Sequence, residues 1–152
     1  MSVCLLDVNT LVALLWTNHE QHEAARAWFL AHQRGGWATC PLTQTGFIRV
    51  SSNPRVFPDA PSPGKAAEIL AANLGHANHH FWKDEIPFTR AVAPFGARLS
   101  GHQQVTDAYL LGLAIHKRGA LATFDAAIAA LLDPKSQATS LEIILGVNGH
   151  KT

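Results

Sequence analysis

One apolar stretch near the N-terminus, residues 3–14, is interrupted by a single carboxylate, Asp7. The run before Asp7 is short and rich in branched side chains, as in a strand that is buried on both faces. After it, Leu11, Leu14 and Leu15 follow at helical spacing. Asp7 is therefore predicted to stand where a central strand ends and a helix begins. In open α/β sheets ligands bind at such a point, but an aspartate there can also simply cap the helix.

The chain has the size and composition of one ordinary globular domain, spanning residues 1–152, of which 47% are hydrophobic. No uncharged apolar run reaches the roughly 18 residues of a membrane span. The first apolar run has no basic segment before it and contains Asp7, so we expect neither a membrane anchor nor a signal peptide, and a cytoplasmic protein. The net charge of +1 decides nothing about nucleic-acid binding.

Cysteines and histidines give little support for a transition-metal site. Cys4 and Cys40 lie in apolar, strand-like segments and are expected to be buried, reduced thiols, with a disulfide as the alternative. Histidines gather at residues 19–22 and 76–80, but without the cysteines that would complete a zinc pattern. Surface positions are therefore expected for these histidines.

Strands and helices are predicted to alternate along the chain. Further strands are predicted at residues 37–42, 79–84, 119–125 and 141–145. Further helices are predicted at residues 20–33, 43–50, 62–74, 103–115 and 126–132. Thr43, Ser62 and Thr106 are the expected helix caps, and the pattern loosens between Pro87 and Gly101. Such alternation implies a mainly parallel sheet with helices on both faces.

Three of the six aspartates stand at predicted junctions of strands and helices: Asp7, Asp107 and Asp125. Because the carboxyl ends of parallel strands share one edge of a sheet, Asp7 and Asp125 should meet there, and a helix leading away can add Asp107. Clustered carboxylates repel one another unless a cation lies between them, and Mg²⁺ or Mn²⁺ suits such oxygen ligands. A metal ion so held can activate water and stabilise a phosphodiester transition state. Each aspartate taken alone could instead be a helix cap.

Four segments together resemble the signature blocks of PIN-domain ribonucleases, and more narrowly the toxins of VapBC-type toxin–antitoxin pairs. They are Leu6–Asn9, Thr39–Arg49, Gln104–Leu110 and Ala122–Asp125. The blocks occur in the family's order, and Val-Thr-Asp-Ala-Tyr at residues 105–109 matches almost letter for letter.

The resemblance implies a three-layer α/β/α sandwich, PIN-like, with a mainly parallel sheet. It also implies RNA cleavage that depends on Mg²⁺ or Mn²⁺, with Asp7, Asp107 and Asp125 as catalytic residues and metal ligands. A homodimer and a small cognate antitoxin are the implied protein partners.

Gln44 departs from the family pattern, which has glutamate at this place. A glutamine carbonyl oxygen can still occupy a ligand position, but without charge. We therefore expect a functional but weaker metal site, with one ion in the absence of substrate, because hard cations are held largely by charge. The alternative is a site that no longer cleaves and only binds RNA or the antitoxin. A phosphatase with Asp7 as nucleophile is disfavoured because Asn9 stands where such enzymes place a second aspartate.

Several neighbours of these residues are candidates for supporting roles. Asn9, Thr106 and Thr123 could orient a carboxylate or a metal-bound water, although turn formation, capping and strand packing would explain them equally well. Arg49 and Arg55 follow the Gln44 segment and could contact RNA phosphates, or simply face solvent. His102, just before the Asp107 segment, is a further candidate for substrate contact.

Overall fold

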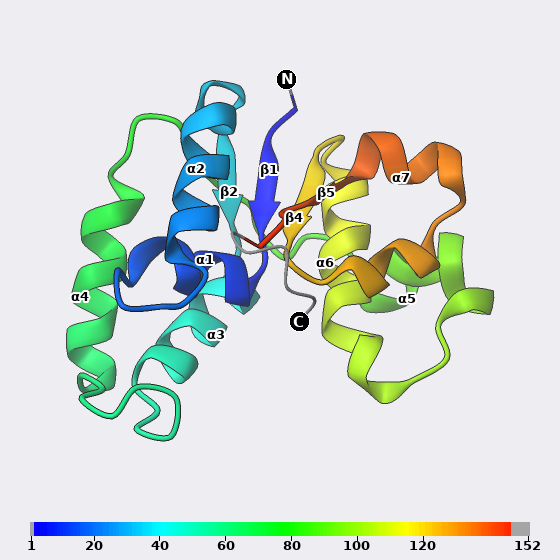
Figure 1. Cartoon of the computed structure of the whole chain (residues 1–152). Coiled ribbons are helices and arrows are strands. Elements are labelled where there is room, and N and C mark those ends of the chain that lie inside the picture. The colour runs from blue at the N-terminus through cyan, green and yellow to red at the C-terminus, as the bar shows by residue number, and fades with distance from the viewer. Residues whose placement is uncertain (1, 147–152) are drawn as a thin grey trace.

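The computed structural model describes residues 2–146, and within them a five-stranded sheet runs in the order β3-β2-β1-β4-β5 (Figure 1). The strands are β1 (Cys4–Leu6), β2 (Trp37–Thr39), β3 (His79–Phe81), β4 (Ala120–Thr123) and β5 (Leu141–Ile143). Every neighbouring pair is parallel. The predicted parallel sheet is confirmed, and so is the edge position of the strand around residue 80. Since β1 lies in the middle, the residue that follows it stands at the centre of one sheet edge.

Helices cover both faces of the sheet, which confirms the three-layer α/β/α architecture (Figure 1). One face carries α1 (Val8–Leu15), α2 (His22–His32), α3 (Pro41–Ser51) and α4 (Pro63–Leu74). The other carries α5 (Phe88–Val92), α6 (Val105–His116) and α7 (Pro134–Ser140). Successive residues of a strand point to opposite faces, so Leu5 packs into the α6 side and Leu6 into the side of α1 and α3. Both leucines are fully buried.

Short 3₁₀ helices complete the connections at η1 (Gln33–Gly35), η2 (Ala93–Arg98), η3 (His102–Gln104) and η4 (Ala126–Leu131). Of these, η4 lies where an α-helix was predicted. The loosely patterned segment before α6 holds α5 and η2. Neither α5 nor α7 was predicted. Pro134 opens α7, with Asp133 as the cap that accepts from the Ser136 N–H.

Two predicted caps lie inside their helices instead. The preceding strand ends at Thr39, and the α3 helix begins at Pro41. Thr43 lies inside the first turn, where its hydroxyl accepts from the Cys40 N–H at 3.0 Å. Thr106 lies within α6 and is exposed. It is not the cap, because η3 runs directly into α6 and Gln104 takes the N-cap position. Ser62 is confirmed as the cap of α4, accepting from the Lys65 N–H at 3.1 Å.

The two cysteines are free and buried, as predicted. His79 is half-buried rather than fully at the surface, with its ring 4.7 Å from that of Trp37. Among residues 2–146, none of the helices is both long enough and apolar enough to cross a membrane.

Candidate metal and active site

Asp7 both caps a helix and faces the candidate site. It follows β1 directly, is 6% exposed, and its Oδ1 accepts from the Thr10 N–H at 2.8 Å, which makes it the N-cap of α1. Its own N–H donates to the Ala122 carbonyl of β4 at 3.2 Å. The cap and the active-site interpretations are thus not alternatives, because the capping bond fixes the carboxylate at the carboxyl end of the central strand.

Burial raises the pKa of the Asp7 carboxyl above its ordinary value, and the charge of Asp125 raises it further. Hydrogen bonds from Thr123 and Thr10 oppose this shift without cancelling it. The surroundings of Asp7 therefore do not fully stabilise its negative charge, and a bound cation would supply the missing stabilisation.

Asp125 lies two residues after the end of the neighbouring strand β4, where it is the N-cap of η4. Its Oδ1 accepts from the Ala127 N–H at 3.0 Å, and its own N–H donates to the Thr123 hydroxyl at 3.0 Å. The buried Thr123 hydroxyl thus holds the Asp125 backbone, and it also lowers the pKa of Asp7, against the effect of burial.

Asp107 lies in the first turn of α6 and completes the group. Burial raises its pKa to about 6, with further contributions from the negative charges of Asp7 and Asp125. The charges of the other two carboxylates therefore act on Asp107. In the described part of the chain none of the three forms an ion pair with lysine, arginine or histidine.

This donor set fits a hard divalent cation. All three side chains offer carboxylate oxygens, and their mutual repulsion is relieved only by positive charge. Within residues 2–146, however, no three acidic, histidine or cysteine side chains already surround a single point as ligands of one ion would. Mg²⁺ commonly takes one or two carboxylates and completes its shell with water and phosphate oxygens, which this more open arrangement allows.

Gln44 is tied to the end of β2. Its Nε2 donates to the Thr39 hydroxyl at 3.0 Å, and that hydroxyl lies 2.7 Å from His79 Nε2 on the edge strand β3. Burial lowers the pKa of His79, which favours a neutral ring that can accept from Thr39. The carboxamide is thus oriented by its NH₂ group, and its carbonyl oxygen is left for other partners.

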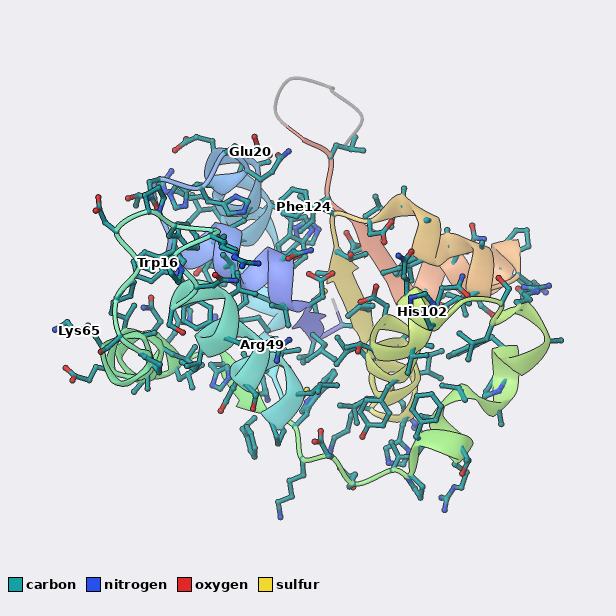
Figure 2. The ribbon with its side chains drawn as sticks, turned by 90° about the horizontal axis from the view of Figure 1, so that it is seen from below. Trp16, Glu20, Arg49, Lys65, His102 and Phe124 are labelled. Carbon is teal, nitrogen blue, oxygen red and sulfur yellow. The ribbon has the colours of Figure 1, made fainter. Side chains whose placement is uncertain are left out.

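The remaining candidates make no hydrogen bond or ion pair to a site aspartate in the described part of the chain. Asn9 and Thr106 are exposed, and neither makes a hydrogen bond to a site aspartate within residues 2–146. Figure 2 looks onto the carboxyl ends of the strands, with Arg49 of α3 and His102 of η3 on opposite sides of the end of β1. Arg55 is exposed in the loop after α3.

A pocket of ≈ 160 Å³ opens beside two of the aspartates. Its polar rim is formed by Gln103, Gln104, Asp107 and Asp125, and its floor by apolar side chains of η4. This pocket could not be predicted from the sequence, because its lining comes from η3, the start of α6 and η4, which only the fold brings together. The Thr39–His79 contact was missed for a similar reason, since its two residues are 40 positions apart.

Comparison with known proteins agrees with this architecture. The PIN domain family matches residues 4–132. "Ribonuclease VapC39" of Mycobacterium tuberculosis is 45% identical over 125 residues, which cover 82% of this chain and 90% of that protein. "Ribonuclease VapC38" of the same organism is 42% identical over 144 residues, covering 93% of this chain and all of the relative.

Two solved structures share this fold with the chain. VapBC2 from Rickettsia felis, bound to a DNA fragment from its promoter, has a chain that superposes with a TM-score of 0.60 at 12% identity, covering 93% of this chain and 98% of that one. FitAcB from Neisseria gonorrhoeae gives a TM-score of 0.55 at 16% identity, covering 91% and 95%. At such low identity the superpositions establish the fold alone. The family match and the sequence identity show that this chain belongs to the PIN-domain family and, within it, to the VapC proteins.

Proposed function

We propose that this protein is a metal-dependent endoribonuclease, the toxin of a type II toxin–antitoxin pair. The observation that carries the proposal is the group of three aspartates at the carboxyl edge of a parallel sheet. Burial and neighbouring carboxylates raise the pKa values of Asp7 and Asp107, and none of the three aspartates has a cationic partner in residues 2–146. The ribonuclease names of the M. tuberculosis relatives support it.

Asp7, Asp107 and Asp125 would hold Mg²⁺, or alternatively Mn²⁺. The bound ion would supply an activated water and would offset the charge that develops on the RNA phosphodiester. The chain's own part is to orient the oxygens: the Thr10 N–H holds Asp7, and the Ala127 N–H holds Asp125. Asp107 must lose its proton to serve as a ligand, which its pKa of about 6 allows at neutral pH.

Arginines near the edge would bind the substrate rather than the ion. Arg49 lies on the site side of α3 (Figure 2), and a guanidinium can donate two hydrogen bonds to one phosphate. Arg55, in the loop after α3, would bind a further phosphate of the same RNA strand. Gln44 would offer its carbonyl oxygen, as a neutral substitute for the glutamate of related proteins.

The test is cleavage of structured RNAs by the purified protein with Mg²⁺ or Mn²⁺, beside the double variant Asp7→Asn/Asp107→Asn. We expect cleavage by the wild type and a loss of at least about a hundredfold in the variant, because metal-ion catalysis contributes several kcal/mol. Circular dichroism would show whether the variant is folded. Equal cleavage by both proteins would refute the proposal, as would RNA binding without any metal-dependent cleavage.

We infer two protein partners as well. A small cognate antitoxin is inferred because the chain belongs to the VapC proteins and one structural neighbour is VapBC2 of Rickettsia felis. A homodimer is inferred from membership of the family. Co-purification with the product of an adjacent short reading frame, and light scattering of the protein alone, test these two inferences separately.

A further inference from the structure

We propose that the pocket beside Asp107 and Asp125 is a binding subsite for one nucleobase of the RNA, next to the phosphate that is cleaved. The inference rests on the proposed ribonuclease function and adds a specificity element to it. It is carried by the size of the pocket, by its lining and by its place beside the carboxylates.

The size restricts the occupant to a small group. The pocket has a volume of ≈ 160 Å³. Sites that enclose a drug-sized ligand measure about 300–1,000 Å³. A single planar heterocycle therefore suits the pocket, whereas a whole nucleotide with its sugar and phosphate does not.

The charges on the rim restrict the occupant further. Two carboxylates, Asp107 and Asp125, line the pocket, and no lysine or arginine does so. An anion would be repelled there, so the occupant is a neutral group rather than a phosphate. On the floor, Ile128 and Leu131 are 4% and 1% exposed and give an apolar surface against which the face of a base can pack.

Two carboxamides supply hydrogen bonds that can distinguish one base from another. The Gln104 Oε1 already accepts from the Ser100 and Gly101 N–H groups, at 2.8 and 3.0 Å, so its carboxamide is fixed and only the NH₂ group faces new partners. Gln103 is exposed and makes no side-chain hydrogen bond in the described structure. A free carboxamide offers an NH₂ donor and a carbonyl acceptor. Such a pair can hydrogen-bond to the acceptor and donor groups on the edge of a base.

Position links the pocket to catalysis. Asp107 and Asp125 belong both to the rim and to the proposed metal site. A base in the pocket therefore lies directly beside the phosphate that the metal ion would engage. The pocket would thus select which phosphodiester bond of an RNA is placed for cleavage.

Ala127 and Ala130 allow a matched test. Both are exposed residues of η4, but only Ala127 lines the pocket. Ala127→Phe would fill the pocket while its backbone N–H can still donate to Asp125 Oδ1. Ala130→Phe adds the same ring to the same helix outside the pocket and serves as the control.

The first measurement needs neither metal nor catalysis. Adenosine, guanosine, cytidine, uridine and inorganic phosphate are titrated against each protein in EDTA, and the side-chain resonances of Gln103, Gln104 and Ile128 are followed by NMR. We expect at least one nucleoside, and not phosphate, to shift them in the wild type and in Ala130→Phe. In Ala127→Phe the affinity should fall on the order of tenfold. Absence of nucleoside binding, equal shifts with phosphate, or equal affinity in the two phenylalanine variants would overturn the proposal.

The second measurement is cleavage of an RNA pool with random sequence, followed by sequencing of the products. The wild type and Ala130→Phe should prefer one base at a fixed position beside the cut, and the preference should fall on the order of tenfold in Ala127→Phe and in Gln103→Ala. Cleavage with an unchanged preference in both would refute the subsite and leave the ribonuclease function standing. Nucleoside binding without any cleavage would support the base-binding pocket and refute the ribonuclease function.

Discussion

At the scale of single residues, Asp107 is a carboxyl group whose ionisation costs stability. Burial and the neighbouring Asp7 and Asp125 raise its pKa to about 6 in the folded protein, from an ordinary value of 3.8. Between these two pH values the folded state holds a proton that the unfolded chain releases. The stability that this group contributes is therefore complete below about pH 4 and is lost as the pH rises through 6.

Replacing this group should consequently stabilise the metal-free protein at high pH. In EDTA, Asp107→Asn is expected to exceed the wild type by about 1–2 kcal/mol of unfolding free energy at pH 8, after allowance for partial exposure, with less advantage at pH 4. Urea unfolding at the two pH values measures this. Mg²⁺ should reduce the difference, because a ligand that binds only the folded wild type stabilises it. A constant difference across pH would contradict the assigned pKa.

Gln44 gives a second prediction at this scale. In Gln44→Glu the new carboxylate replaces the NH₂ donor, so the Thr39 hydroxyl has to turn away from His79 in order to donate to it. The added negative charge should tighten Mn²⁺ binding on the order of tenfold, measured by calorimetry above pH 7. Ala67→Glu, which adds the same charge on the exposed face of α4, is the control. An affinity that does not change, or that rises equally in the control, would place Gln44 outside the metal site.

At the scale of elements, the approach of α5 to α6 depends on one glycine. A Cβ at Gly112 would collide with the carbonyl of Ala91, which is backbone and cannot swing aside. Gly112→Ala should therefore destabilise the protein by roughly 1–3 kcal/mol, as overpacking does. Gly64, in the first turn of α4, has no atom within 4 Å of the place where its Cβ would lie. Gly64→Ala should be neutral or stabilising by about 0.5–1 kcal/mol in the same urea experiment, and equal effects would refute the packing argument.

The elements that could be predicted from sequence are those whose pattern follows from burial. β1 is apolar throughout, and β4 is apolar except for Thr123, because both faces of these strands are covered. The helix α6 is apolar on most sides because residues 108–114 are all buried. By contrast, α5 and α7 are short, and their capping residues resemble those of turns. The starts of α3 and α6 depend on the bond between Thr43 and Cys40 and on the run of η3 into α6, which no local spacing reveals.

Of the candidate site, only the acidic residues could be predicted from the sequence. Asp7, Asp107 and Asp125 stand at junctions that topology brings to one edge, so their electrostatic coupling follows from the order of elements. The Gln44–Thr39–His79 chain depends on the register of β2 with β3, and the pocket depends on how η3 meets η4. Such relations arise from tertiary contacts and leave no pattern in the sequence.

At the scale of the whole molecule, the central strand should be the most protected part of the backbone. The Asp7 N–H donates to Ala122, and the Ala120 N–H donates to Val3, so these amides open only when the sheet comes apart. Native-state hydrogen exchange at Asp7 and Ala120 should therefore report the global free energy of unfolding. Amides of the edge strand β3 should exchange faster, through local opening, and slower exchange there than at Asp7 would contradict the prediction.

The place of β1 in the sheet also has a consequence for how the protein is made. Thr10, one turn into the chain's first helix, bonds to Ala122, which the ribosome adds 112 residues later. Asp7 is synthesised long before Ala122, yet its surroundings are complete only when β4 has emerged from the ribosome and paired. Formation of such long-range parallel contacts is slow. Under the proposed ribonuclease function, the site could not cut RNA until β4 had been made and had joined the sheet.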